Sequence, residues 1–180
     1  MSHTRSLPRW RSDQGFTLIE LGVVIGILGV LLALASVSLS RARLAANEAS
    51  AIADLRDIAT GQFAYAVGCG RGSYAVSLAV LGSKPPGVQH SFLNEDLGST
   101  ITATHSGYLV NVHGGLNSVP TVPDCMNNLA QSTYYASAIP EKYDRTGRRS
   151  FATNQAGAIY QDYAAVPPAE PFRPDQVFGK

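Results

Sequence analysis

Residues 16–35 form an apolar run in which Thr17 and Glu20 are the only polar residues, and no charged residue follows Glu20 before Arg41. A helix rises about 1.5 Å per residue, so this run would be about 30 Å long, which matches the hydrocarbon core of a bilayer. The rest of the 180-residue chain has an ordinary mixture of residues and is long enough for about one domain. The run therefore predicts a membrane-spanning helix joined to one soluble domain.

A cleaved secretory signal is the alternative interpretation of this run, because a basic segment precedes it. A signal of that kind has an apolar region of about 7 to 15 residues and ends at small residues. Here the run is longer, and residues 36–40 continue the helical pattern, which favours a retained helix. The flanking charges do not decide which end stays in the cytoplasm, since arginines lie on both sides. They are Arg5, Arg9 and Arg11 before the run, and Arg41, Arg43 and Arg56 after it.

The carboxylate of Glu20 is unusual because it stands at the head of an otherwise uncharged run. A charged group beside hydrocarbon is unfavourable, and acids inside membrane segments usually mark a partner or a pathway. The alternative is a side chain that extends to the headgroup region at the end of a simple anchor helix. The position of Glu20 therefore indicates either that its charge is paired with a group of another molecule or that it marks the headgroup end of a simple anchor helix.

Residues 15–21, Gly-Phe-Thr-Leu-Ile-Glu-Leu, follow a short basic leader and precede the apolar helix. This segment resembles the N-terminus of a type IV pilin or of a type II secretion pseudopilin. The resemblance implies that a prepilin peptidase cuts between Gly15 and Phe16 on the cytoplasmic side, and that the new amine of Phe16 is methylated. It also implies that Glu20 faces the positive amino terminus of a neighbouring subunit, and pairing offsets much of the cost of burying a charge.

Small residues recur every four positions in the apolar run and would allow helices to approach closely. They are Gly22 and Gly26, and Gly29 and Ala33. This spacing is consistent with a helix that packs against copies of itself. One departure from many pilins is the absence of proline between Phe16 and Pro85.

An amphipathic pattern continues beyond the apolar run, with apolar residues at steps of three and four. They are Leu44, Ala51, Ile52, Leu55, Ile58, Ala59, Phe63 and Ala66. Gly68, Gly70 and Gly72 predict the end of the helix. The expected organisation is a leader at residues 1–15, a membrane or filament-core helix at 16–40, its amphipathic continuation at 41–66, and a globular head at 67–180.

The head is predicted to be a small antiparallel sheet that covers the apolar stripe of the helix, which gives an α+β, pilin-like fold. Strand patterns occur at residues 101–112, 133–139 and 150–160, and the last is expected to turn at Gly157. A short helix is expected at residues 77–81. The proline-rich tail at residues 166–174 is expected to run extended over the head or to remain mobile.

Cys69 and Cys125 are the only cysteines. An exported head would enter an oxidising compartment, where a disulfide between them is expected; two unpaired thiols are the alternative. Closing a loop of this length would contribute roughly 4 kcal/mol in the chain-entropy model.

No catalytic or cofactor site is expected from the sequence. His90, His105 and His113 lack the spacing of a zinc site, and no serine, histidine and acid can be assigned to a triad. The glycine-rich segment after the helix lacks the ending of a phosphate-binding loop. The basic cluster of Lys142, Arg145, Arg148 and Arg149 is interleaved with Glu141 and Asp144, so nucleic acid is not expected as the main partner.

The leading hypothesis is a structural subunit of a type IV pilus, favoured over a type II secretion pseudopilin because the leader is long and the head carries a cysteine pair. The implied partners are other pilin subunits, the prepilin peptidase, an inner-membrane platform protein and an assembly ATPase. The expected location is the inner membrane with the head outside the cytoplasm, and then an extracellular pilus or a periplasmic pseudopilus. The alternative from another class is a monomeric, membrane-tethered periplasmic binding domain.

Overall fold

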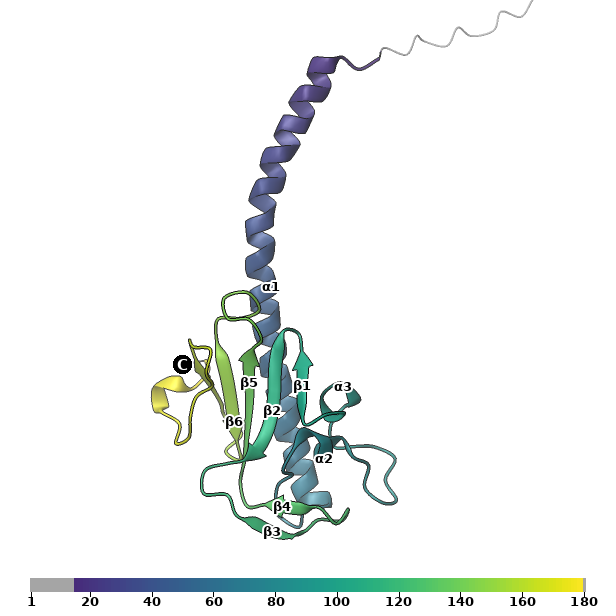
Figure 1. Cartoon of the computed structure of the whole chain (residues 1–180), viewed down its shortest axis with the longest axis vertical. Helices are drawn as coiled ribbons and strands as arrows, with labels where there is room; N and C mark the ends of the chain where they lie inside the picture. Colours follow the sequence, from purple (N-terminus) through teal and green to yellow (C-terminus); the bar gives the residue numbers. More distant parts are fainter. Residues whose placement is uncertain (1–14, 180) are drawn as a thin grey trace, which may run out of the picture. The chain divides into compact units, whose positions relative to one another are not determined.

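The computed structural model describes residues 15–179, with the side chains of residues 36–38 excepted. Residues 1–14 of the expected leader lie outside this range. The chain divides into two units at the boundary between residues 40 and 41, and the described residues of each unit are treated separately. Figure 1 labels most of the helices and strands named below. Helix α1, Leu18–Gly68, contributes its first part to one unit and its second part to the other.

In the first unit, α1 is long and apolar enough to cross a membrane. Large apolar side chains at its start and just before it are exposed, including Leu18 at 91% and, before the helix, Phe16 at 80%. Burial inside a protein core does not explain these residues. They need lipid or other helices as partners.

The second unit contains the rest of α1 and two short helices whose first turns are capped by side chains. The Ser77 side chain accepts a hydrogen bond from the Val80 N–H at the start of α2, Leu78–Gly82. The Asn94 side chain accepts one from the Leu97 N–H at the start of α3, Glu95–Gly98. Both caps satisfy backbone donors that a helix leaves unpaired at its N-terminus.

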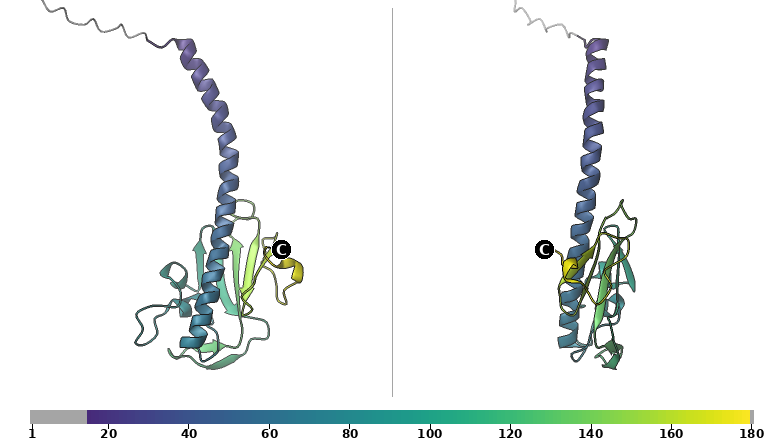
Figure 2. Two further views of the ribbon diagram at one scale, coloured as in Figure 1. Left: turned by 180° about the vertical axis from the view of Figure 1, so that it is seen from behind. Right: turned by 90° about the vertical axis from the view of Figure 1, so that its left-hand side faces the viewer.

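Five antiparallel strands form the main sheet in the order β1-β2-β5-β6-β7, and two more form a separate hairpin. The main strands are β1 Thr102–His105, β2 Tyr108–Gly114, β5 Tyr134–Pro140, β6 Ser150–Asn154 and β7 Ile159–Asp162. The hairpin consists of β3 Pro120–Pro123 and β4 Leu129–Gln131. Within this unit, α1 covers one face of the main sheet, so the head has two layers (Figure 2).

The core lies between α1 and this face of the sheet, because alternate strand residues face the helix. Leu55, Ile58 and Tyr65 of α1 are fully buried, as are Val110 of β2 and Phe151 of β6. The predicted α+β fold with a long N-terminal helix and an antiparallel sheet is therefore confirmed.

Two details of the prediction were wrong. Residues 101–112 form two strands and not one, because Ser106 and Gly107 both have positive φ and turn the chain into a hairpin. Phe63 does not lie in the core stripe: it is 71% exposed, whereas the neighbouring Gln62 is fully buried. The Gln62 amide bonds both the N–H and the carbonyl of Ala75, so this polar side chain satisfies its hydrogen bonds inside the core.

The C-terminal tail passes from the outer face of the sheet around the β7 edge. On the outer face, Phe172 stacks on Tyr160 with ring centroids 3.9 Å apart, and the Tyr135 hydroxyl donates to the Pro168 carbonyl at 2.7 Å. Beyond the edge, the Phe178 ring meets Phe151 of the core. The tail therefore closes the open edge of the sheet as well as covering its outer face.

Candidate processing and assembly site

The peptide bond between Gly15 and Phe16 precedes the helix and is exposed. Residues 15–17 are not helical, and α1 begins at Leu18. Both residues are exposed, so among residues 15–179 no packed side chain covers the backbone at this junction. The geometry is compatible with proteolysis at the expected position.

Thr17 and Glu20 form reciprocal hydrogen bonds at the helix start. The Glu20 N–H donates to the Thr17 hydroxyl oxygen at 3.2 Å, and the Thr17 N–H donates to Glu20 Oε2 at 3.3 Å. The Thr17 hydroxyl also donates to Oε2 at 3.1 Å. This is a capping box, which satisfies two free donors of the first turn. Sequence reasoning missed it, although a threonine three residues before a glutamate carries its signature.

The capping box affects how Glu20 can act in assembly. Its bonds use Oε2, and Oε1 accepts no hydrogen bond from residues 15–179. A carboxylate offers about four acceptor positions, so Glu20 can keep its cap and still accept from an ammonium group. The side chain is also exposed, which leaves it accessible to a second molecule.

The four small residues expected to pack helices lie on open surface. A Cβ added at Gly22, Gly26 or Gly29 would meet nothing within 4 Å, and Ala33 is exposed. Their surroundings include large exposed apolar side chains such as Ile25 at 61% and Leu32 at 70%. The first unit thus presents a helix with space for close approach and an apolar surface to cover.

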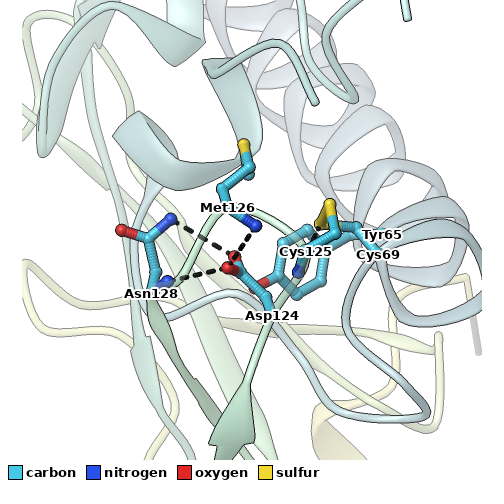
Figure 3. Close-up of a disulfide and its surroundings, with 6 residues drawn as sticks. All are labelled: Tyr65, Cys69, Asp124, Cys125, Met126 and Asn128. Carbon is cyan, nitrogen blue, oxygen red and sulfur yellow. Dashed lines mark hydrogen bonds between the residues drawn. A yellow bond between two sulfur atoms is a disulfide. The ribbon is translucent and has the colours of Figure 1, made fainter. Parts of the chain in front are cut away.

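A disulfide joins Cys69, directly after α1, to Cys125 in the turn between β3 and β4. Beside it, Asp124 accepts hydrogen bonds from the Tyr65 hydroxyl at 2.6 Å and from the backbone N–H groups of Met126 and Asn128 (Figure 3). Burial raises the pKa of Asp124, but these hydrogen bonds outweigh it and hold the pKa below its usual value. The disulfide and the carboxylate together fasten the hairpin to the end of the helix.

Two further side-chain contacts attach α1 to the sheet. Asp54, almost fully buried, lies 2.9 Å from His105 Nδ1 on β1. Burial raises the pKa of Asp54 in spite of the opposing effect of His105. Glu48 pairs with Arg149 at 2.6 Å and also accepts from the Arg148 N–H at 2.9 Å. His105 and Arg149, which the sequence analysis considered for metal and nucleic-acid binding, therefore hold α1 against the sheet in the head.

The described part of the chain presents no assembled catalytic chemistry. Among residues 15–179 no three His, Cys, Asp or Glu side chains are grouped to hold a metal ion, and His113 contacts Gly114 and Tyr135. The features that the site brings together are an exposed Gly15–Phe16 junction, a capped acid and a helix with exposed apolar residues.

Comparison with known proteins adds evidence at the same segment. A family model described as the prokaryotic N-terminal methylation motif matches residues 10–36. No curated protein and no solved structure matches the chain significantly. The match spans the Gly15–Phe16 junction, Glu20 and the apolar run, and part of it, residues 10–14, precedes the described residues. Residues 10–36 of this chain therefore carry the prokaryotic N-terminal methylation motif, which is the prepilin-type motif of type IV pilins and pseudopilins.

Proposed function

We propose that this protein is a structural subunit of a type IV pilus. The observation that carries the proposal is the coincidence of three features in one segment: the methylation motif, the exposed acid at Glu20 and the exposed large apolar residues in the first part of α1. An apolar helix of this length is supported by lipid before assembly and by other helices afterwards. The head supplies the filament surface.

In this proposal the chain is made as a precursor in the inner membrane with its head outside the cytoplasm. A prepilin peptidase cuts between Gly15 and Phe16 and methylates the new amine. A platform protein and a cytoplasmic ATPase then drive the mature subunit into the filament, where Glu20 accepts from the amino terminus of a neighbour. Because that amine exists only after cleavage, the uncut precursor lacks the partner of Glu20 and assembles poorly.

The test is filament formation in cells that contain a prepilin peptidase and the assembly machinery. Glu20→Gln keeps an acceptor for the cap but removes the charge, so it separates ionic pairing from helix capping. Losing one member of a buried ion pair costs about 3–5 kcal/mol, which lowers the association constant at least about a hundredfold. We expect Glu20→Gln subunits to be processed normally and to form few filaments when seen by electron microscopy.

Asp57→Asn is the matched control, because Asp57 is an exposed acid on the same helix but lies in the head. It is expected to assemble like the wild type. Normal filaments from Glu20→Gln would contradict the pairing. A chain that is not cleaved, and whose behaviour neither substitution changes, would instead support the membrane-tethered binding domain.

The same motif serves pseudopilins of type II secretion, so the location of the assembled fibre decides between the two roles. A pilus extends from the cell surface, whereas a pseudopilus remains in the periplasm and its loss blocks protein secretion. We favour the pilus because of the long leader and the cysteine pair. Wild-type secretion in a strain lacking this gene, with loss of surface fibres, is the expected result.

A further inference from the structure

A pocket of about 470 Å³ lies on the outer face of the head, where β2 ends and the C-terminal tail crosses the sheet. Its walls come from β2, β5, the loop after β2 and the tail. They include His113, Leu116, Tyr135, Pro167, Ala169 and Glu170. The volume falls in the usual range of ligand sites, about 300–1,000 Å³. Neither processing nor helix packing uses this pocket.

The pocket combines apolar walls with acceptors of hydrogen bonds. Glu170 accepts from the Leu116 N–H at 2.5 Å and from the Asn154 side chain at 2.6 Å, and within residues 15–179 it forms no ion pair. His113 Nδ1 lies 2.7 Å from the Gly114 carbonyl, so this nitrogen carries the proton in the neutral ring and Nε2 remains an acceptor. The rings of His113 and Tyr135 are stacked with centroids 5.0 Å apart.

This chemistry favours a cation on an apolar stem. An uncompensated carboxylate attracts positive charge, the aromatic faces attract cations, and the apolar walls suit methylene groups. Arginine and lysine side chains have all three properties. Arginine fits better, since its planar guanidinium both stacks on rings and donates to a carboxylate.

Suitable cations lie on the loop between β5 and β6, residues 141–149. Arg148 of this loop pairs with Asp144, and Arg149 pairs with Glu48. Lys142 and Arg145 are exposed and form no ion pair with any residue in the described part of the chain. Arg145 is therefore the arginine of this loop that is available to another molecule.

The strand register places the pocket and this loop at opposite ends of the sheet. Gly114 pairs with Tyr134 at the pocket end, and Tyr108 pairs with Pro140 at the loop end (Figure 1). The six residue steps of β5 separate the two ends by roughly 20 Å, which Arg145 cannot bridge within one molecule. A contact between them must join two copies. Complementary groups at opposite ends of a molecule produce an open, head-to-tail assembly.

We propose that the pocket at Glu170 receives the Arg145 side chain of a second copy of this chain, so that the heads as well as the helices hold successive subunits together. This inference rests on the proposed function, because it assigns a contact within the same filament. It adds a salt-sensitive, orientation-specific interaction to the non-directional apolar packing of α1.

The first test exchanges the charges in the full chain. Arg145→Glu and Glu170→Lys are each expected to lower the filament yield per processed subunit about fivefold, a typical effect of one interface charge pair. The double variant is expected to recover at least half of the wild-type yield. Arg148→Glu combined with Glu170→Lys is the control and is not expected to recover, because Arg148 already has a partner in its own loop. A double variant no better than the product of the two single effects would overturn the proposal.

The second test examines the pocket without assembly. The full chain in detergent micelles is titrated with N-acetyl-arginine methylamide and, as a neutral isostere, with the corresponding citrulline compound. Saturable NMR shifts at His113 and Tyr135 with the arginine probe alone, lost in Glu170→Gln, are expected. No shift, or equal shifts with both probes, would overturn the assigned chemistry.

The outcomes separate this inference from the proposed function. Wild-type filaments that are unaffected by the charge substitutions refute the contact at Glu170 and leave the filament role intact. A wild-type chain that is never processed or assembled refutes the filament role, and with it the second copy as the occupant of the pocket.

Discussion

At Asp124 a single carboxylate collects hydrogen bonds from a helix tyrosine and from its own turn. The pKa of Asp124 is lowered in the fold, so this group contributes stability above the ordinary aspartate pKa of about 3.9, and the contribution is lost as pH falls through the lowered value. Asp124→Asn is expected to lower the unfolding free energy at pH 7 by about 1–3 kcal/mol, because an amide cannot accept all these bonds. Urea denaturation at pH 7 and pH 3 measures it.

The difference in unfolding free energy between wild type and Asp124→Asn is expected to be smaller at pH 3 than at pH 7. Asp175→Asn is the control, because that carboxylate is exposed and its ion pair in the described part of the chain is a 3.8 Å contact with Arg173. An equal loss at both pH values would show that shape, and not charge, is what Asp124 supplies.

The contribution of Asp54 to stability is expected to change with pH in the opposite direction to that of Asp124. Burial, the largest effect, raises the pKa of Asp54, and His105 only partly opposes it. Its contribution to stability is therefore present below the ordinary aspartate pKa and is lost as pH rises through the raised folded value. Asp54→Asn removes this loss, so the stability of the variant relative to wild type is expected to improve from pH 4 to pH 7.

Thermal unfolding of the two chains at both pH values measures this effect of Asp54. The same comparison in a His105→Gln background shows whether burial of Asp54 is sufficient for the effect, because this substitution removes the opposing contact. A relative stability that falls from pH 4 to pH 7 would contradict the assigned direction.

Individual residues show where sequence reasoning is limited. The motif residues Gly15, Phe16 and Glu20 could be identified because their meaning lies in local order. Phe63 could not be placed correctly, since it lies one position, about 100°, beyond Gln62 on the helix and only the contact of Gln62 with Ala75 decides which is buried. Asp124 could not be recognised at all, because its partner Tyr65 is 59 residues away.

Among the elements, the hairpin of β3 and β4 depends most on a covalent link. The disulfide spans 56 residues and ties the hairpin to the end of α1. Replacing both cysteines by serine is expected to lower the unfolding free energy by about 4 kcal/mol in the chain-entropy model. Amide hydrogen exchange is expected to accelerate chiefly in β3 and β4. The main sheet is expected to stay protected at denaturant concentrations too low to unfold the protein. Exchange that accelerates equally in all strands would contradict this local role, and reduction of the wild type is the matching control.

The C-terminal tail is held by aromatic stacking, mainly of Phe172 on Tyr160 and Tyr135. Aromatic pairs contribute about 0.5–1.5 kcal/mol beyond the area that they bury. Phe172→Ala is expected to increase amide exchange at Phe178, whose N–H donates to the Ile159 carbonyl, by about fivefold. Val166→Ala, in an exposed part of the same tail, is the control. Unchanged exchange at Phe178 in Phe172→Ala would mean that the tail is held elsewhere.

Strand positions were predictable where apolar alternation was strong, as in β5 and β6. Strands β1 and β2 were predicted as one strand, because the alternation at Tyr108, Val110 and Val112 continued a pattern that began before the Ser106–Gly107 turn. The β3–β4 hairpin gave little signal, since it is short and lies between prolines and exposed residues. Its position depends on the disulfide and on Asp124, which are long-range contacts.

At the scale of the whole molecule, the two units have different needs. The head buries its own core and fastens its edges, whereas the large apolar residues at the start of α1 are exposed. The sequence predicts this division from the length of one uncharged run. It does not reveal the pocket at Glu170, because that pocket is assembled from β2, β5 and a tail that are distant in the chain.

The central claim is that this chain is a prepilin-type precursor, and the most direct test is the intact mass and N-terminal sequence of the protein from membranes that contain a prepilin peptidase. We predict a mature chain without residues 1–15, beginning at Phe16 with one added methyl group. Such a chain also lacks tryptophan fluorescence, because Trp10 is the only tryptophan. A chain that retains Met1 and Trp10 under these conditions would contradict the claim.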